Sequence, residues 1–480
     1  MSILAGIMSR RGEDIAAKLL QMLNKATPAQ SDAYGLASSD AVETHMRLPD
    51  IPSISSKTVL GYRLLKVKIE DVPQPLQQDN QALVFNGNLW EIEEPDLLKA
   101  ADILRWDSEE GLRKLLLEQK GSWAAAVAEE NRLLLSVDPI GIVPLYYGIN
   151  DELAAIASNN KTILAAGLTP IKAEPGCLIE LSEEGVRKER IAGLWDIPTA
   201  ISIEEAIDRL DQLLTQAVKR NTSRLTSVNL AFSGGIDSTL LAYYLKEAGV
   251  RPHLACVGAE ESSDISAADK AAESLGLSIH VTTYNESDIE AHLDAILNSV
   301  EEPDPMKVGV AIPLYFVVLN ASTSGSRVVF SGNGSDELFG GYAKYVAEYQ
   351  TSGESVRSTM FNDITRSHEV NFSRDWNICT DLGVELRLPY ADPDLTAFAL
   401  TLPTTYKLPK QGKDPRKIIL RRLAEKLELP TEVAHRPKKA AQYSSGSMKI
   451  MKRLAKRRGI SIPGFLAKRW WNIKRGEEIG

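Results

Sequence analysis

The sequence predicts an α/β chain with a sheet-rich first half and a doubly wound parallel sheet in the second half. Up to about residue 190, short runs of alternating apolar residues are separated by turn residues. Beyond residue 200, short apolar strands alternate with amphipathic helices, a pattern that favours a parallel sheet with helices on both faces. Residues 192–200 mix Gly and Pro with little periodicity. We therefore expect two domains, at 1–195 and 200–480.

The individual elements follow from the same periodicities. In the first half, we expect strands at residues 82–85, 123–127, 133–137 and 178–181. In the second half, a helix is expected over 203–219, followed by strands at 228–232, 253–257, 279–282 and 327–331. Helices are expected between and after these strands, at 238–248, 265–275, 287–299 and 312–322.

The composition is that of an ordinary soluble chain. Of 480 residues, 44% are apolar and 25% charged, and the net charge of −9 gives no general case for a nucleic-acid partner. The three cysteines lie far apart and lack metal-site spacing, which fits a reducing cytosol. The first residues lack the pattern of a signal peptide or a spanning helix. We expect a cytoplasmic protein without a membrane partner. The sequence leaves open whether the protein forms a homodimer.

The turn Ser233–Ser238 joins the strand at 228–232 to the next helix. Gly234 and Gly235 let backbone N–H groups face an anion, and the start of the helix adds partial positive charge. A carboxylate at Asp237 would repel a polyphosphate unless Mg²⁺ joined the two groups. The sequence therefore predicts a site for ATP and Mg²⁺. No Gly-x-x-x-x-Gly-Lys-Ser/Thr loop follows a strand, which argues against γ-phosphate transfer.

Two further turns are expected at the same edge of the sheet, because the carboxyl ends of parallel strands share one crevice. Val257 follows the second strand, and the glycine-rich segment Ser331–Tyr342 follows the fourth. Asp336 in this segment is expected to face Asp237 and to act as a second ligand for Mg²⁺. The predicted residues that bind ATP or its diphosphate are Phe232, Ser233, Gly234, Gly235, Asp237, Ser238, Val257, Ser331 and Gly332.

Both glycine-rich turns resemble those of a known family. Ser233–Ser238 resembles the diphosphate-binding loop of the N-type ATP pyrophosphatases, and Ser331–Tyr342 is similar to Ser-Gly-Glu-Gly-Ser-Asp-Glu-Leu-Phe-Gly-Gly-Tyr of asparagine synthetases. Residues 381–392 and 436–443 also resemble segments of that family. The resemblance implies a HUP-like sheet with extra C-terminal helices and a ligase that cleaves ATP to AMP and diphosphate. It further implies that Glu385 is the acid/base near the acceptor nitrogen and that Lys438 stabilises the acyl-adenylate.

The first half resembles the class II glutamine amidotransferases. Residues 1–7, Phe85–Trp90 and Asp138–Tyr147 are similar to segments of that family. The resemblance implies an Ntn-type αββα sandwich. It also implies that Arg63 binds the glutamine carboxylate and that Asn86 with Gly87 supplies oxyanion donors.

Three departures from these families bear on the reaction. Ser2 stands where the amidotransferases carry a nucleophilic cysteine, and residues 91–122 lack the Gly-Ser-Asp turn that binds the glutamine amino group. We therefore expect a degenerate glutaminase domain and free ammonia as the nitrogen source. Asn333 replaces the acid of the second loop, and Met306–Pro313 lacks the family's Arg and Ser. The loss of the Arg weakens the case for aspartate as the substrate, and Lys307 is a candidate to compensate for it.

The leading hypothesis is an AMP-forming asparagine synthetase that amidates aspartate through a β-aspartyl-adenylate. One alternative is a β-lactam-synthetase-like enzyme, or another enzyme that amidates or cyclises a different carboxylate. A second alternative is an RNA-modifying ATP pyrophosphatase that docks tRNA through the basic tail beyond residue 449, which includes Trp470 and Trp471. Such a tail is also consistent with a solvated helical face.

Overall fold

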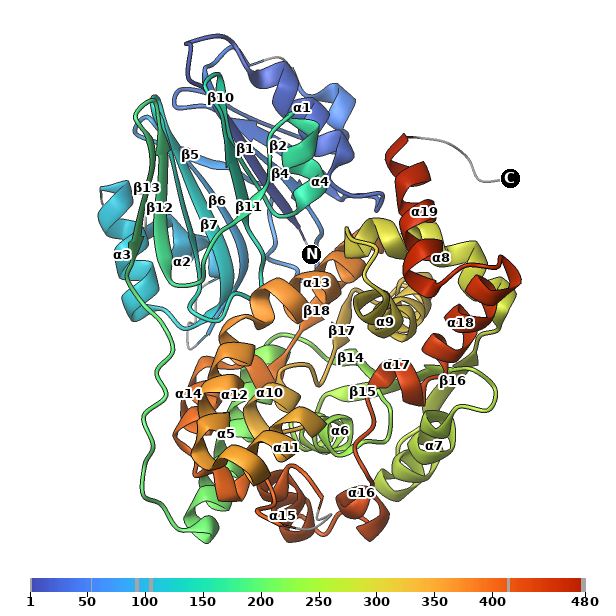
Figure 1. Cartoon of the computed structure of the whole chain (residues 1–480). Helices are drawn as coiled ribbons and strands as arrows, with labels where there is room; N and C mark the ends of the chain where they lie inside the picture. The colour runs from blue at the N-terminus through green and yellow to red at the C-terminus, as the bar shows by residue number, and fades with distance from the viewer. Residues whose placement is uncertain (1, 53, 91–94, 103–106, 412–414, 476–480) are drawn as a thin grey trace. The chain divides into compact units, whose positions relative to one another are not determined.

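The computed structural model describes residues 2–52, 54–90, 95–102, 107–411 and 415–475. Its contacts divide the chain into two compact units, which Figure 1 shows in blue to green and in green to red. Unit 1 holds Met1–Leu194 together with the short segment Thr380–Glu385. Unit 2 holds Trp195–Cys379 and Leu386–Gly480.

Unit 1 is built from two antiparallel sheets. The seven-stranded sheet has the order β11 (Ile171–Lys172), β9 (Tyr146–Ile149), β10 (Leu153–Ala157), β1 (Ile3–Ser9), β4 (Thr58–Leu64), β2 (Ala33–Ala37) and β3 (Val42–His45). The six-stranded sheet has the order β13 (Gly185–Arg190), β12 (Cys177–Ser182), β8 (Arg132–Val137), β7 (Gly121–Glu129), β6 (Gln81–Leu89) and β5 (Leu76–Gln78). The four strands predicted for this half lie within β6, β7, β8 and β12.

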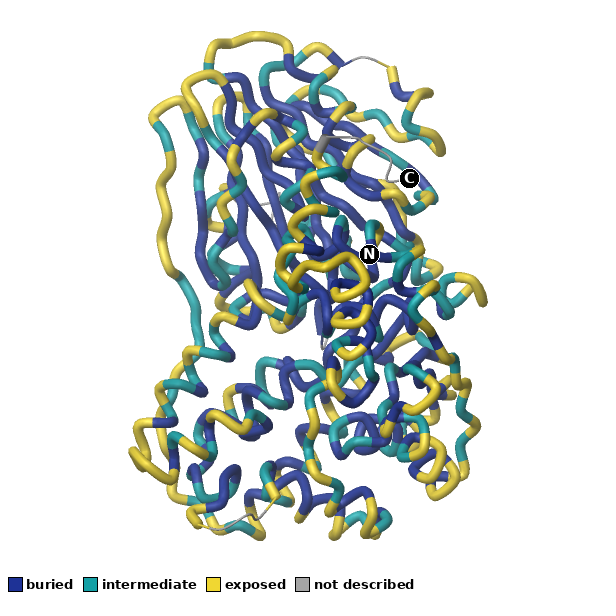
Figure 2. Tube along the Cα trace, turned by 45° about the vertical axis from the view of Figure 1, so that its right-hand side comes forward, coloured by how far each residue is buried: buried dark blue, intermediate teal, exposed yellow. Residues whose placement is uncertain are grey.

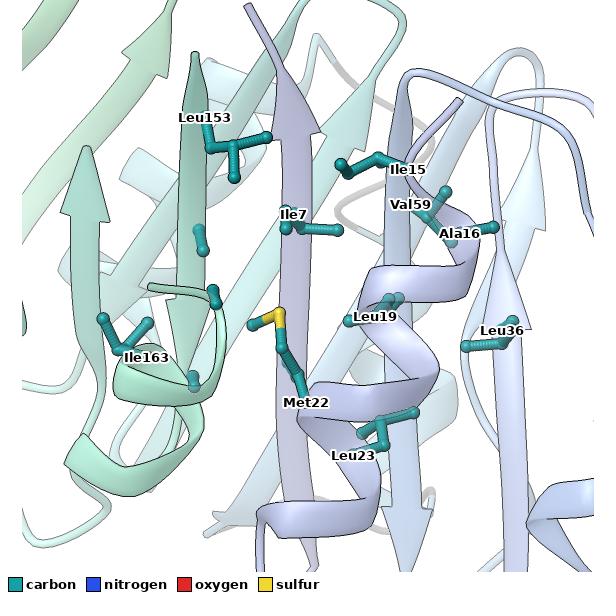
Figure 3. Close-up of a cluster of buried hydrophobic side chains, with 14 of the residues drawn as sticks. Ile7, Ile15, Ala16, Leu19, Met22, Leu23, Leu36, Val59, Leu153 and Ile163 are labelled. Carbon is teal, nitrogen blue, oxygen red and sulfur yellow. The ribbon is translucent and has the colours of Figure 1, made fainter. Parts of the chain in front are cut away.

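Helices cover the outer faces of these sheets. α1 (Ala16–Lys25) and α4 (Asn160–Ala165) pack on the seven-stranded sheet, where Leu19, Met22 and Leu23 are fully buried against β1 and β4 (Figure 3). Each such side chain contributes about 1.5–3 kcal/mol by leaving water. α2 (Asp96–Ala101) and α3 (Ser108–Glu118) pack on the six-stranded sheet. The inner faces of the sheets contact each other, so most strands are buried (Figure 2). The predicted αββα sandwich is confirmed.

Unit 2 contains a five-stranded sheet in the order β16 (Ile279–Thr283), β15 (Arg251–Gly258), β14 (Ser227–Ala231), β17 (Val328–Phe330) and β18 (Glu385–Arg387). The pairs β14 with β15, β15 with β16 and β14 with β17 are parallel. The chain runs outward from β14 to β16 and then returns to place β17 on the other side of β14. This reversal creates the crevice in which doubly wound sheets bind ligands. The predicted fold class is confirmed.

The helix before β14 and the helices between the strands overlap the predicted segments, although α9 begins seven residues earlier than predicted. They are α5 (Ile203–Thr222), α6 (Ile236–Glu247), α7 (Ser263–Leu275), α8 (Glu286–Val300) and α9 (Pro305–Thr323). α5 begins with a capping box in which Ser202 and Glu205 satisfy each other's backbone N–H groups. α7 ends at Gly276, whose left-handed conformation (φ 63°) closes the helix.

The remaining helices lie in unit 2, except that the end of α13 belongs to the short segment assigned to unit 1. They are α10 (Ser335–Phe339), α11 (Ala343–Ser352), α12 (Val356–Thr365), α13 (Ser373–Asp381), α14 (Pro393–Thr401), α15 (Ile418–Lys426), α16 (Thr431–His435), α17 (Ala441–Ser444), α18 (Ser447–Arg457) and α19 (Ile462–Arg475). Short helical turns lie at Leu48–Asp50, Gly353–Ser355, His368–Phe372, Pro389–Ala391 and Thr404–Tyr406.

Candidate active site

The turn between β14 and α6 has the shape of an anion-binding loop. Gly234 has φ 64°, and a Cβ at this position would lie 2.5 Å from the backbone of Ala267, so only glycine fits. Gly235 caps α6 without any side-chain hydrogen bond to the first helical turn. Backbone N–H groups at the start of α6 therefore face the crevice as donors to an anion. Arg436 fixes the turn by donating to the Ser233 carbonyl at 2.6 Å.

The turn after β17 lies directly against the first turn. A Cβ added to Gly332 would lie 3.2 Å from the Cβ of Asp237. Further along, a Cβ at Gly341 would lie 1.9 Å from Oδ1 of Asp336. The absence of side chains at these two glycines lets the backbone pack around both carboxylates.

Asp237 and Asp336 share two lysine side chains. Nζ of Lys417 lies 2.6 Å from Oδ1 of Asp237 and 2.6 Å from Oδ1 of Asp336. Nζ of Lys438 lies 3.4 Å from Oδ2 of Asp237 and 2.9 Å from Oδ2 of Asp336. Ser335 also donates from its hydroxyl to Oδ1 of Asp237 at 2.8 Å. We call these two carboxylates and two ammonium groups the Asp–Lys cluster.

The charges of the Asp–Lys cluster reinforce one another. Burial alone would raise the pKa of Asp336, but the ammonium groups of Lys417 and Lys438 outweigh it and hold that pKa well below its usual value. Burial alone would lower the pKa of Lys438, but the two carboxylates raise it above its usual value. Lys438 therefore remains a cation at neutral pH.

Lys417 was not predicted from the sequence. Its side chain is 0% exposed, and it begins α15 in a left-handed conformation with φ 63°. The backbone N–H of Lys417 donates to the Lys407 carbonyl at 2.9 Å, which fixes this unusual conformation. A buried lysine of this kind persists because opposite charges compensate for its loss of water.

The backbone near Lys438 is held by two arginines. Arg416 donates to the Lys438 carbonyl at 2.6 Å and to the Gly341 carbonyl at 2.7 Å. Arg421 donates to the Arg436 carbonyl at 3.0 Å. These bonds tie the segment that carries Lys438 to α15 and to the second glycine-rich turn.

The Asp–Lys cluster opens into a cavity of about 400 Å³, here called the large cavity. This volume lies in the usual range for small-molecule sites. The predicted residues that line it are Phe232, Ser233, Asp237, Ser238, Val257, Ser331, Gly332, Asp336 and Lys438. α9 adds an apolar wall that includes Val310, Leu314 and Val317. The large cavity thus combines an apolar surface, suited to a nucleobase, with a charged end suited to phosphates.

Lys307 also lines the large cavity, at the start of α9. Its ammonium group pairs with the carboxylate of Glu302. A substrate carboxylate would share Lys307 with Glu302 or displace it.

Two cavities of unit 1 bear on the predicted glutamine site. The one near Ser2, here called the small cavity, has a volume of about 50 Å³, and another, lined by Arg63 and Tyr34, has about 480 Å³. The lining of the small cavity includes three residues predicted as the glutaminase remnant, Ser2, Asn86 and Gly87. Asn86 donates from Nδ2 to the Ser2 carbonyl at 2.8 Å, and the Ser2 hydroxyl accepts from the backbone N–H of Leu65 at 3.0 Å. Gly87 has φ 138°, and a Cβ there would lie 2.1 Å from the Ser122 carbonyl oxygen.

Glu385 lines the small cavity and is absent from the lining of the large cavity. Nδ2 of Asn88 donates to Oε1 of Glu385 at 3.3 Å. Glu385 is the first residue of β18. Its role as the acid/base near the acceptor nitrogen stays a prediction.

Arg63 lies outside the lining of the small cavity, although Tyr62 and Leu64 belong to it. Strand alternation in β4 explains this difference. The Arg63 guanidinium donates to the carbonyls of Leu23, Thr27 and Ala29 at 2.9–3.0 Å. It also donates to the Ser31 hydroxyl at 3.0 Å. These bonds hold the loop after α1, and Arg63 is the cross-strand partner of Ile3, which follows Ser2. Its role in binding the glutamine carboxylate stays a prediction.

Part of the stretch expected to lack the Gly-Ser-Asp turn, namely residues 91–94 and 103–106, lies outside the described residues. The described part contains Asp96, which pairs with Lys68 at 2.5 Å.

Comparison with known proteins identifies the family. The model of the asparagine synthase family matches residues 209–354 and 346–459, more than half of the chain. The chain belongs to the asparagine synthase family. A model described as a glutamine amidotransferase domain matches residues 62–165. Family membership makes the chain an ATP-dependent carbon–nitrogen ligase that forms amides, as the sequence predicted.

Two relatives extend this match over both units. A putative glutamine-hydrolyzing asparagine synthetase of Methanocaldococcus jannaschii is 28% identical over 526 residues and covers 96% of each chain. The glutamine-hydrolyzing asparagine synthetase B of Escherichia coli is 26% identical and covers 83% of this chain and 77% of its own. Among solved structures, a glutamine phosphoribosylpyrophosphate amidotransferase of B. subtilis aligns at 19% identity with a TM-score of 0.35, over 54% of this chain and 67% of that chain. That score is too low to support an argument.

Many basic side chains of the C-terminal tail are paired with acidic side chains of α8. Arg457 lies 2.7 Å from Glu286, and Arg469 lies 2.6 Å from Asp294. Arg458 pairs with Glu290. These ion pairs join α18 and α19 to α8.

One helix in the described part of the chain, α9, is long and apolar enough by composition to cross a membrane. It packs against α8, α17 and β15, and half of its apolar window is buried. A core helix meets the same criteria of length and composition.

Proposed function

We propose that the protein activates the side-chain carboxylate of aspartate with ATP and amidates it with ammonia. In the first step, a carboxylate oxygen attacks the α-phosphorus of ATP, the bond to the diphosphate breaks, and an acyl-adenylate forms. In the second step, ammonia attacks the acyl carbon, AMP leaves with the bonding electron pair, the nitrogen releases one proton to solvent, and asparagine results. The single observation that carries this proposal is the Asp–Lys cluster at the contact of the two glycine-rich turns.

The Asp–Lys cluster supplies what the first step requires. Negative charge grows on the leaving diphosphate as its bond to the α-phosphorus breaks, and cations already in place stabilise that charge without reorganisation. Lys417 and Lys438 provide two such cations, and the backbone N–H groups at the start of α6 provide donors.

The donor set also fits Mg²⁺, which prefers carboxylate and phosphate oxygens. Asp237 and Asp336 would hold the ion in the large cavity. When bound, Mg²⁺ would neutralise charge on the diphosphate oxygens. The same two carboxylates would meanwhile keep their contacts with the lysines that face the diphosphate.

The volume of the small cavity in unit 1 and the contacts of Arg63 favour ammonia over glutamine as the nitrogen source. The small cavity is about eight times smaller than the large one, at about 50 Å³ against about 400 Å³. Sites for small molecules usually exceed about 300 Å³. The Arg63 guanidinium, which the family resemblance assigns to glutamine binding, is committed to backbone carbonyls.

A second candidate substrate is a different carboxylate with a more apolar body. This candidate is favoured by the apolar wall of α9 and by the pairing of Lys307 with Glu302, which leaves that lysine neutralised. Recognition of the second carboxylate of aspartate would require that carboxylate to share Lys307 with Glu302 or to displace Glu302.

The test is to incubate the purified full chain with ATP, Mg²⁺, isotopically labelled ammonium and aspartate. We expect AMP, diphosphate and labelled asparagine in equal amounts, measured by mass spectrometry. Replacement of aspartate by a panel of apolar monocarboxylates tests the second candidate in the same assay. Release of ADP, or no ATP cleavage with any carboxylate, would contradict the proposed AMP-forming reaction.

A further inference from the structure

One side chain in the wall of the large cavity has a buried oxygen without a donor. Gln442 on α17 is 4% exposed and belongs to the lining of the large cavity. Its Oε1 is buried, and no donor among the described residues forms a hydrogen bond with it. Native structures rarely leave a buried carbonyl oxygen in this state, because the lost hydrogen bond destabilises the fold. A half-turn of the terminal amide lets that oxygen face the cavity, so a bound ligand is the natural source of the missing donor.

The backbone of Gln442 is held against α9. The hydroxyl of Ser447 donates to the Gly309 carbonyl at 2.7 Å and to the Gln442 carbonyl at 3.2 Å. A Cβ added to Gly309 would lie only 3.1 Å from the Cβ of Gln442. The glycine thus lets α17 approach α9 closely, and the Gln442 side chain leaves the backbone from a fixed point. Gly309 lies within Met306–Pro313, the segment that lacks the family's Arg and Ser.

The other end of α17 is fixed to the turn that follows β15. The Ser445 carbonyl accepts from the backbone N–H of Ala259 at 2.8 Å and from the hydroxyl of Tyr284 at 3.0 Å. The hydroxyl of Ser262 donates to the Ser444 carbonyl at 2.8 Å. The wall that carries Gln442 is therefore formed before a ligand arrives, and a preformed wall reduces the entropy lost on binding.

The carboxylates in the described lining of the large cavity already have cations of the chain as partners. The Asp–Lys cluster contains two of them. Asp264 pairs with Arg436 at 2.9 Å, and Asp375 pairs with Arg374 at 2.7 Å. Each of these carboxylates is thus engaged in the unliganded chain. The oxygen of Gln442 differs from them because it is an acceptor that no described side chain or backbone group uses.

The chemistry of an amide oxygen limits what it binds. It accepts hydrogen bonds from N–H and O–H groups, and it does not attract a carboxylate. An ammonium group forms the strongest bond of this kind because it is charged. Lys307, near Gly309 on α9, also lines the large cavity and would share its charge between Glu302 and a substrate carboxylate. A substrate with a carboxylate for Lys307 and an ammonium group for Gln442 is an α-amino acid, with a further carboxylate left for activation by ATP.

We propose that Gln442 is a specificity-determining residue whose side-chain oxygen accepts a hydrogen bond from the ammonium group of an amino-acid substrate. This inference rests on the proposed AMP-forming function and names the class of carboxylate that the function requires. A carboxylate without an amino group leaves the Gln442 oxygen unpaired in the complex. Such a substrate is disfavoured, because a site built to accept a hydrogen bond rejects an analogue that cannot donate it.

The test combines the variant Gln442→Met with two substrates that differ in one group. Succinate is aspartate without its amino group. The readout is kcat/KM for the exchange of labelled diphosphate into ATP, without ammonium, which reports the first step alone. We expect wild type to prefer aspartate, and we expect the ratio of aspartate to succinate to fall by about 10–100-fold in Gln442→Met, the loss of one hydrogen bond to a charged group. An unchanged ratio would overturn the proposal.

The amino group of adenine is a second N–H donor that ATP itself brings to the large cavity. Purine riboside triphosphate lacks this group, so the ratio of exchange with ATP to exchange with this analogue measures its contribution. We expect this ratio to agree within about 2-fold between wild type and Gln442→Met. A ratio that falls in the variant, with no change in the ratio of aspartate to succinate, would assign Gln442 to the nucleotide and overturn its assignment to the carboxylate substrate.

Two further variants separate this role from a general effect on the fold. Gln442→Glu keeps an acceptor oxygen in the same side chain, so we expect it to retain the preference for aspartate over succinate. A loss of that preference equal to the loss in Gln442→Met would contradict the proposal. Tyr443→Phe is the matched control, since Tyr443 is the next residue of α17, is 61% exposed and lies outside the described lining of the large cavity. Its ratio of aspartate to succinate should stay within about 2-fold of wild type.

The same exchange assay distinguishes a failure of this inference from a failure of the proposed function. If wild type shows no exchange with any carboxylate, the proposed function fails. If wild type exchanges with aspartate and Gln442→Met leaves the ratio of aspartate to succinate unchanged, only this inference fails. Exchange by wild type with carboxylates that lack an amino group, and with no amino acid, would also overturn the inference alone.

Discussion

The large and small cavities differ in what their charged side chains do. In the large cavity, Asp237 and Asp336 are held by two lysines that face a volume of about 400 Å³. In the small cavity, Glu70, Asp71 and Glu385 face a volume of only about 50 Å³. The guanidinium of Arg63, which the resemblance places among the glutamine ligands, instead binds the loop after α1.

The two units thus differ in the contacts that the residues of the family motifs make. In unit 2, the residues of the family motifs meet at one site with complementary charges, as a reaction with phosphates requires. In unit 1, two residues of the family motifs make contacts that hold the fold. Arg63 closes a loop, and Gly87 allows the close approach of two strands. The three predictions below test this contrast in order of decreasing effect.

Substitution of Lys438 should give the largest loss of activity. Lys438 lies 2.9 Å from Asp336 and lines the large cavity, so Lys438→Met removes a cation that would face the leaving diphosphate. We expect exchange of diphosphate into ATP to fall by about 10²–10³-fold, as for loss of one charged group that stabilises a transition state. The measurement is the exchange rate at saturating ATP.

Lys439→Met is the matched control for this substitution. Lys439 is the next residue in the chain, and its side chain is exposed. We expect its exchange rate to stay within about 2-fold of wild type, since surface charges contribute little. A large loss with Lys439→Met and none with Lys438→Met would show that the neighbouring lysine is the functional one.

The sequence was sufficient to predict the sheets and the two glycine-rich turns, because these depend on local patterns. The strand predicted at 228–232 corresponds to β14 (Ser227–Ala231), and Gly234 adopts the left-handed conformation that such a turn needs. Lys417 could not be predicted in this way. Its partners, Asp237 and Asp336, lie 180 and 81 residues away in the chain, and no local pattern marks a lysine that is buried between them.

The sequence left open which cavity the side chain of each motif residue would line. A motif shows that a residue is present, but a one-residue change of position on a strand sends its side chain to the opposite face. Arg63 lies between Tyr62 and Leu64, which line the small cavity, while its own side chain points to the loop after α1. Glu385 begins β18 and lines the small cavity for the same reason. Only coordinates show which cavity each side chain faces.

Asp138 is a buried acid of unit 1 whose contribution to the free energy of unfolding can be measured. Its carboxylate accepts from the backbone N–H groups of Trp123, Ile140 and Gly141 at 2.8–3.0 Å, and burial raises its pKa from 3.8 to about 6. A carboxyl group with a raised pKa in the folded state stabilises the fold fully below its unfolded pKa and loses that effect as pH rises through 6. The free energy of unfolding should therefore fall by about 2–3 kcal/mol between pH 4 and pH 6.

The variant Asp138→Asn should remove this decrease, because an amide does not titrate. It keeps an oxygen for Ile140 and Gly141, so the fold should form at lower stability. The measurement is urea unfolding at pH 4, 5 and 6, with Asp151→Asn at an exposed turn as the control. Equal pH dependence in wild type and in Asp138→Asn would contradict this account.

The smallest effect is expected from restoring a nucleophile in the small cavity. Ser2→Cys introduces the thiol that the amidotransferase resemblance implies, and a thiol is the better nucleophile near neutral pH. Even so, we expect no more glutamate release from glutamine than with Ser2→Ala, and amide formation from ammonium within about 2-fold of wild type. The reason is geometric: a volume of about 50 Å³ is far below that of typical ligand sites, and the Arg63 donors are bound to Leu23, Thr27 and Ala29.

Glutamate release is measured with labelled glutamine. If Ser2→Cys gained glutaminase activity over Ser2→Ala, the small cavity would have to open and Arg63 would have to leave its loop. Unit 1 would then be a glutaminase that lacks only its nucleophile, and the contrast between the two cavities would reduce to one side chain.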